Sequence, residues 1–291
     1  MKEHNNGHQK LDDNDANFSF QQQQPSPRIK VTPLVATNDS WVTLYENVLS
    51  PQDSLRLLQE LSQELPWNVE TDQFGPQSRP TCYFADPDCT FSYVGLKLDP
   101  AAPNNNKDDD DDSNNNKYWH PTVQKLRERV TLAAADQLLT PATTTTNESS
   151  SPLTACLVNL YPKGEGFIPW HYDEIRAHGK DKIVASLSLG GPRRFQLRTR
   201  VAVEKSDAKQ EEKPRMVADL WLPSGSVLLM KGEVQENYEH CLPLETAEPS
   251  SSKTKQSQDD VINPLRISLT FRSIVPGYEN DRSIATDQCC T

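Results

Sequence analysis

Residues 170–174, with the sequence WHYDE, place a histidine and an aspartate two positions apart. In an extended chain, residues i and i+2 point to the same side, so His171 and Asp173 would converge on one point. His240, in the stretch NYEHCLP, is a candidate third ligand. Two histidines and one carboxylate on one face of an octahedron leave three positions open, as in non-haem iron(II) oxygenases. HxD arises often by chance, so the metal interpretation needs support from other residues.

The stretch LRISLTFR provides a second polar group on one predicted strand face. Arg266 and Arg272 are six positions apart, so a strand points both side chains the same way, and Ser268 and Thr270 share that face. Arginines inside a β-core are costly without an anionic partner, and a small dicarboxylate would supply charge-assisted, bidentate bonds. The alternative is an exposed edge strand whose arginines pair with surface acids.

Asn159 and Tyr161 form a third group, again two positions apart on a predicted strand, with Leu160 on the opposite face. Their amide and phenol groups would be able to hydrogen-bond a carboxylate. They would serve equally well as ordinary polar residues at the end of a strand.

These groups need elements that position them, and the pattern predicts two helices followed by many short strands. Ser50-Pro51 is typical of a helix start, and a second helix is expected from near Pro121. The predicted apolar faces are Leu55, Leu58, Leu61 and Leu65 in the first helix, and Val123, Leu126, Val130 and Leu138 in the second. Strands are expected at 91–98, 155–161, 183–189, 193–198, 219–222, 226–230 and 265–272. We expect a mostly β protein with flanking helices, built as a sheet sandwich or barrel.

Polar, low-complexity blocks interrupt this pattern. Residues 1–30 are expected to form a disordered tail and 277–291 a C-terminal tail, with one domain at 40–276. Four insertions are expected as surface loops near 101–117, 140–152, 204–214 and 247–261. The net charge of -11 is unusual for a nucleic-acid binder, but much of the acid lies in local runs such as 108–112. A basic face on the domain is therefore compatible with the composition.

The six cysteines form no CxxC pair, and no apolar run is long enough to span a bilayer. We therefore expect a soluble intracellular protein in a reducing compartment, without a membrane partner. A monomer is expected.

The order Asn-x-Tyr, His-x-Asp, His, Arg-x5-Arg resembles the AlkB family of Fe(II)- and 2-oxoglutarate-dependent dioxygenases. The nearest resemblance is to its eukaryotic nucleic-acid-repair members of the third-homologue type, over roughly 40–276 apart from the insertions. The stretches that carry it are LPWN (65–68), SRPTCYF (78–84), FSYVGLKLDP (91–100), SLSLGGPRRFQLR (186–198), PSGSVLLMKGEVQENYEH (223–240) and PLRISLTFR (264–272).

This resemblance implies a double-stranded β-helix, or jelly roll, and assigns roles to the matching positions. Iron(II) would be held by His171, Asp173 and His240, with O2 as a further cosubstrate. The residues implied to hold 2-oxoglutarate are Asn159, Tyr161, Arg266, Thr270 and Arg272. No catalytic side chain is implied beyond the metal centre.

The resemblance also implies substrate contacts. The segment from Arg79 to Tyr83 resembles a nucleotide-recognition lid, for which a plain hairpin with inward aromatic rings is the alternative. Glu174 matches an acid that contacts the flipped base, although relatives commonly carry Asp-Asp-Glu where this chain has Asp173, Glu174 and Ile175. Arg193 matches an arginine that would reach phosphate or form a structural salt bridge.

The implied function is oxidative demethylation of N-alkylated bases in DNA or RNA, releasing formaldehyde, succinate and CO2, as in DNA repair. Nucleic acid is the expected partner, and the nucleus or cytoplasm the expected location. One alternative keeps the chemistry but acts on protein or another non-nucleic-acid substrate. Two others are a binding module that has lost catalysis and a zinc hydrolase, which would not need Arg266 and Arg272.

Overall fold

The structure is a computed structural model, and two antiparallel β-sheets form its centre. It describes residues 28–72, 74–93, 95–100, 118–139, 151–162, 166–173, 178, 182–201, 213–244 and 265–277. All of the described strand pairings are antiparallel. This arrangement confirms the prediction of a mostly β protein with flanking helices and a jelly-roll core.

The larger sheet has seven strands in the order β1-β2-β13-β10-β15-β8-β5. Their bounds are β1 Lys30–Ala36, β2 Ser40–Glu46, β13 Val227–Gly232, β10 Ile183–Gly190, β15 Arg266–Arg272, β8 Ala155–Tyr161 and β5 Thr81–Ala85. The smaller sheet has four strands in the order β12-β11-β14-β9. Their bounds are β12 Met216–Leu222, β11 Arg193–Thr199, β14 Tyr238–Leu242 and β9 Ile168–His171. Two short hairpins, β3 (Thr71–Asp72) with β4 (Gly75–Pro76) and β6 (Phe91–Tyr93) with β7 (Leu96–Leu98), accompany the sheets.

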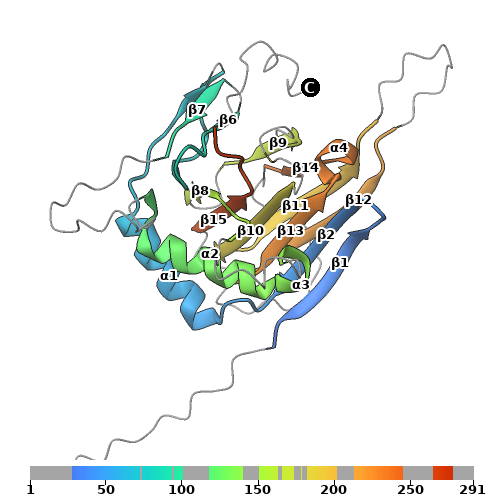
Figure 1. The fold of residues 1–291 in the computed structure, drawn as a ribbon, viewed down its shortest axis with the longest axis horizontal. Helices are drawn as coiled ribbons and strands as arrows, with labels where there is room; N and C mark the ends of the chain where they lie inside the picture. Colours follow the sequence, from blue (N-terminus) through green and yellow to red (C-terminus); the bar gives the residue numbers. More distant parts are fainter. Residues whose placement is uncertain are drawn as a thin grey trace, which may run out of the picture.

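The helices α1 (Pro51–Glu64) and α2 (Pro121–Ala133) lie side by side against the larger sheet, as Figure 1 shows. Each begins as its sequence predicts: Ser50 accepts the main-chain N–H of Asp53, and His120 accepts that of Thr122. The apolar face of α1 differs from the predicted one, because Leu55 is exposed and Leu57 is buried in its place. Two single-turn helices, α3 (Ala135–Leu138) and α4 (Val234–Asn237), complete the set described.

Two main apolar cores hold these layers together. One lies between the helices and the larger sheet and includes Leu58, Leu61 and Val130. The other contains Tyr161 and Leu228 from the larger sheet and side chains of the smaller sheet. Successive strand residues face opposite sides, so one face of each inner strand packs on the helices and the other faces the smaller sheet. The predicted site residues of β8 and β15 lie on the second of these faces.

Three expectations about the elements are corrected. The two helices were expected to precede the strands, but two strands, β1 and β2, come before the first helix. β1, which pairs with β2, begins at Lys30, before the predicted domain start at residue 40. The single strand expected at 91–98 is a hairpin, because Gly95 adopts a φ of 80° that permits a turn there. The strand expected at 219–222 begins earlier, at Met216.

The predicted insertions near 101–117 and 247–261 lie outside the described residues. So do most of the predicted tails, 1–30 and 277–291, and most of the insertions near 140–152 and 204–214. Among the described residues, no helix is long and apolar enough to cross a membrane.

Candidate metal centre and cosubstrate pocket

The three predicted metal ligands lie on adjacent strands of the smaller sheet or next to them. Strand β9 ends at His171, which is paired in register with His240 of β14. Their imidazole ring centroids are 4.2 Å apart. Asp173 follows two residues after His171 and is buried. Strand pairing therefore brings together side chains that are almost 70 positions apart in the sequence.

Burial and neighbouring charges set the protonation states of this group. Burial, followed by the nearby His171, lowers the pKa of His240 to about 3. Burial also lowers the pKa of His171. For Asp173, burial acts to raise the pKa, but Arg272 and the two histidines outweigh it and hold the pKa below its usual range. Neutral imidazoles beside an ionised carboxylate are the forms that bind a metal ion.

Polar contacts orient two of these side chains. The Nδ1 of His171 lies 2.9 Å from the carbonyl oxygen of Pro169, which can only accept, so Nδ1 carries the proton and Nε2 is left for a ligand. Arg272 donates to Oδ1 of Asp173 at 3.1 Å. The other oxygen, Oδ2, and the Nδ1 of His240 are buried and find no hydrogen-bond partner among the described residues.

The three residues fit iron(II) in their side-chain types, their protonation states and their closeness to one another. Their side chains are not, however, oriented around one common point. As they stand, no three His, Cys, Asp or Glu side chains in the described part of the chain are arranged to hold a metal ion. The carboxylate of Asp173 is instead turned with one oxygen toward Arg272. The unsatisfied Oδ2 beside two neutral imidazoles is the observation that favours a metal here.

The predicted cosubstrate residues lie opposite one another on β8 and β15. Arg266 is in register with Tyr161, and Ser268 with Asn159. The guanidinium of Arg266 lies 5.1 Å from the centre of the Tyr161 ring and donates to Oγ of Ser188 at 3.0 Å. The Tyr161 hydroxyl is buried without a hydrogen-bond partner among the described residues. The edge-strand alternative for the arginines is wrong, because every residue of β15 is buried and the strand is paired on both sides.

Thr270 and Arg272 continue this face of β15 toward the candidate metal ligands. Thr270 Oγ1 accepts from the Ser186 hydroxyl at 3.2 Å. Arg272 packs its guanidinium over the Phe91 ring, 4.6 Å from the centroid, while it bonds Asp173. The two predicted clusters are therefore in direct contact through Arg272.

The lid residues point inward. Arg79 donates through Nε to the side-chain oxygen of Asn159 at 2.8 Å, which attaches the segment before β5 to the predicted cosubstrate face. Tyr83 donates its hydroxyl to the carbonyl of Cys89 at 2.6 Å and stacks on Phe91. These contacts of Tyr83 favour a plain hairpin with an inward-packed aromatic ring over a role in a nucleotide-recognition lid.

Arg193 is 1% exposed and donates to the carbonyl oxygens of Gly166 and Pro243. A guanidinium so enclosed is not available to a phosphate at the surface, so its surroundings favour a structural role. Glu174 lies outside the described residues.

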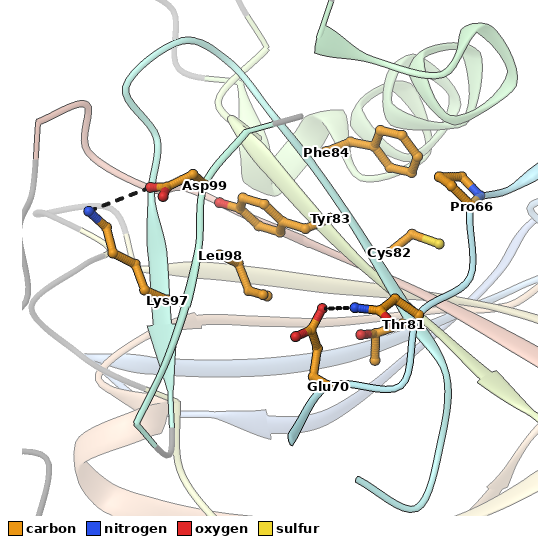
Figure 2. A pocket seen from close by; sticks show the side chains of 10 residues that line it. Pro66, Glu70, Thr81, Cys82, Tyr83, Phe84, Lys97, Leu98 and Asp99 are labelled. Atoms are coloured by element: carbon orange, nitrogen blue, oxygen red, sulfur yellow. Dashed lines mark hydrogen bonds and ion pairs between the residues drawn. The ribbon is translucent and has the colours of Figure 1, made fainter. Parts of the chain in front are cut away.

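A separate hollow of about 310 Å³ lies between β5 and the β6–β7 hairpin, as Figure 2 shows. The charged side chains Glu70, Lys97 and Asp99 line it together with Tyr83. None of the predicted metal or cosubstrate residues lines it, so it is distinct from the candidate reaction site.

Two contacts of this site were not predicted. The amide oxygen of Gln235 accepts the main-chain N–H of Asp173 at 2.9 Å, and Phe91 packs against Arg272. The spacing of residues in the sequence could not predict either contact, because the partners are distant in the chain and meet only when it is folded.

Comparison with known proteins identifies the family of the chain. Residues 41–272 match the profile of the 2OG-Fe(II) oxygenase superfamily, and the chain belongs to this family. It is an Fe(II)- and 2-oxoglutarate-dependent dioxygenase that uses O2, and a zinc hydrolase is thereby excluded. Within the superfamily it is of the AlkB type.

Relatives of the AlkB type span most of the chain. It is 24% identical over 250 residues to alpha-ketoglutarate-dependent dioxygenase alkB homolog 3 of Homo sapiens, covering 84% of this chain and 69% of that one. It is 25% identical over 193 residues to the DNA oxidative demethylase ALKBH2 of Bos taurus, covering 66% and 52%. The solved structure of OsALKBH1 is 17% identical with a TM-score of 0.44, covering 79% of this chain and 96% of that one.

Proposed function

We propose that this dioxygenase demethylates N-alkylated bases in DNA or RNA, releasing formaldehyde, succinate and CO2. The names of its relatives support a nucleic-acid substrate: one is a DNA oxidative demethylase and another, from Arabidopsis thaliana, an alkylated DNA repair protein homolog. A nucleic-acid substrate would place the protein in the nucleus or the cytoplasm.

The observation that carries the proposed site is the 3.1 Å contact between Arg272 and Asp173. It joins the strand expected to hold 2-oxoglutarate to the group expected to hold iron. In an oxygenase of this kind the residues that would hold the cosubstrate and those that would hold the metal must be neighbours, because the two groups would react together. A site for two unrelated ligands would not need this contact.

We assign iron(II) binding to His171, Asp173 and His240. When bound, the iron couples oxidative decarboxylation of 2-oxoglutarate to hydroxylation of the N-methyl carbon of the substrate. The hydroxymethylated base then releases formaldehyde. The protein's task is to hold the reactants in place and to limit access of water.

The cosubstrate would be held by the face of β8 and β15. Arg266 offers a buried guanidinium for the distal carboxylate, and Tyr161 offers a hydroxyl that has no acceptor among the described residues. Asn159 is positioned for this face by Arg79. Thr270 and Arg272 extend the same wall to the metal.

Only a base that is unpaired or flipped out of the helix would be able to enter this buried site. A base stacked inside a double helix is inaccessible to a buried centre, so the enzyme would take single strands or flip the base out. Arg79 and Glu174 are retained as proposed substrate contacts, while Tyr83 is not, because its ring packs inward on Phe91. Arg79 is the better placed because it borders the cosubstrate face.

The test is mass spectrometry of an oligonucleotide carrying 1-methyladenine or 3-methylcytosine, incubated with the protein, iron(II), ascorbate and 2-oxoglutarate. We expect the loss of one methylene mass per lesion, dependent on 2-oxoglutarate. The His171→Ala variant should be folded but inactive, because it lacks one proposed iron ligand.

The alternative outcomes separate the parts of the proposal. Succinate formation without loss of the methyl group would contradict the nucleic-acid substrate and leave an oxygenase acting on another molecule. Full turnover by His171→Ala would contradict the assignment of the metal ligands.

A further inference from the structure

Asp173 lies just beyond the end of strand β9, outside the β-ladder. Strand β9 ends at His171, whose register partner is His240. Two residues later, the main-chain N–H of Asp173 has no strand partner and donates instead to the side-chain oxygen of Gln235 at 2.9 Å. Gln235 is 2% exposed and belongs to α4. A buried amide therefore replaces the missing ladder contact.

Arg200 contacts the same two parts of the chain. Its guanidinium lies 3.7 Å from the centre of the Tyr172 ring, the residue immediately before Asp173. Its Nη1 donates to the main-chain oxygen of Gln235 at 2.9 Å, and its main-chain N–H donates to the oxygen of Asn237 at 2.9 Å. Arg200 thus contacts both the residue that precedes Asp173 and the short helix that holds it.

We propose that Gln235 and Arg200 are positioning residues for the metal carboxylate, an inference that rests on the proposed role of Asp173 as an iron ligand. Gln235 fixes the main chain of Asp173, and Arg272 takes Oδ1 of its carboxylate. Between these two contacts, Oδ2 remains unsatisfied among the described residues and is the oxygen presented to the metal.

The physical reason is that a ligand on a strand end is otherwise poorly fixed. A metal site requires its ligands to be held within about 0.5 Å of the productive geometry. Groups that orient a ligand without touching the metal commonly change metal affinity by about 10–100-fold when they are removed. Arg200 acts at one remove, through Tyr172 and Gln235, so its effect should be the smaller of the two.

The test measures Mn(II) binding by electron paramagnetic resonance in the absence of substrate and 2-oxoglutarate. Gln235→Met keeps the side-chain volume but removes the acceptor, and we expect it to weaken Mn(II) binding about tenfold or more. Arg200→Met should weaken it in the same direction by a smaller factor. The matched control is Gln137→Met on α3, which removes a 3.1 Å hydrogen bond from Gln137 to Thr43 of β2 and should leave Mn(II) affinity unchanged.

Melting temperature separates positioning from a general structural role. If Gln235→Met and Gln137→Met lower the melting temperature similarly and only Gln235→Met loses affinity, the positioning role is supported. Should Gln235→Met fail to fold, Arg200→Met carries the same test.

Asp173→Asn distinguishes this inference from the proposed function. If Asp173→Asn loses Mn(II) binding while Gln235→Met and Arg200→Met stay within about twofold of the wild type, the positioning role is overturned and the ligand assignment stands. If Asp173→Asn binds Mn(II) as the wild type does, the ligand assignment itself is overturned.

Discussion

At the scale of single residues, Asp173 shows how the protein keeps a charge inside the fold. The Asp173 and Arg272 side chains are 7% and 9% exposed, and they form an ion pair 3.1 Å long. Arg272 is in turn covered by the ring of Phe91. A buried pair of this kind contributes little net stability, but the loss of one partner leaves an uncompensated charge.

We therefore predict that Arg272→Met destabilises the metal-free protein by about 3–5 kcal/mol, because the carboxylate of Asp173 remains buried without its cation. Mn(II) should restore part of this stability by supplying the missing positive charge. The measurement is urea unfolding with and without Mn(II). The double variant Arg272→Met/Asp173→Asn should be more stable than the single one, and equal stability of the two would contradict the argument.

A second prediction concerns pH. The pKa of His240 is lowered from 6.5 to about 3 in the folded chain, so the unfolded chain binds a proton that the folded chain does not. The free energy of unfolding of the metal-free protein should therefore be fully retained above about pH 6.5 and decline as the pH falls toward about 3. Urea unfolding across this range checks it. The decline should be shallower in His240→Gln, and identical slopes would contradict the assignment.

At the scale of elements, strand ends and turns decide which side chains meet. β10 ends at Gly190, which has a φ of 86°, a conformation that side chains with a Cβ rarely adopt. A Cβ there would lie 2.1 Å from the carbonyl oxygen of Leu265, just before β15, and 2.9 Å from a methyl carbon of Leu58 on α1. The close approach of these elements helps to place Arg266 in the pocket.

Gly190→Ala should accordingly lower stability by clearly more than about 1 kcal/mol, because backbone strain and a clash with main chain act together. The matched variant is Gly95→Ala, where φ is 80° but a Cβ would meet nothing within 4 Å. Thermal unfolding of both variants separates the two effects. A similar loss in the two variants would show that strain alone accounts for Gly190.

At the scale of the whole molecule, the site is shared between the two sheets. His171 and His240 come from the smaller sheet, whereas Asn159, Arg266 and Arg272 come from the larger one. Ligands bound here would contact both layers of the fold. They would then stabilise the folded chain by mass action, since the unfolded chain lacks the site.

The corresponding prediction is that Mn(II) and 2-oxoglutarate together raise the melting temperature more than Mn(II) alone. At about a hundredfold excess over the dissociation constant, a ligand adds about 2.7 kcal/mol. Arg266→Met should remove the increment due to 2-oxoglutarate and keep that due to Mn(II), as measured by differential scanning fluorimetry. An unchanged response to 2-oxoglutarate would contradict the role proposed for Arg266.

The sequence alone determined which side chains share a strand face, because side-chain alternation along a strand is a local property. It was sufficient to place Asn159 with Tyr161 and Arg266 with Arg272, and the structure has both pairs buried on β8 and β15. Helix starts were equally predictable, since a cap depends on residues within one turn.

Only the tertiary structure decided what those faces meet. Gln235 reaches Asp173 across 62 positions, Phe91 covers Arg272, and Arg193 donates to the main-chain carbonyl of Gly166. These contacts depend on how sheets and hairpins pack against each other, which local patterns do not specify. Strand pairing likewise brought His240 beside His171. The sequence named both histidines as candidate ligands but did not specify that their strands would pair.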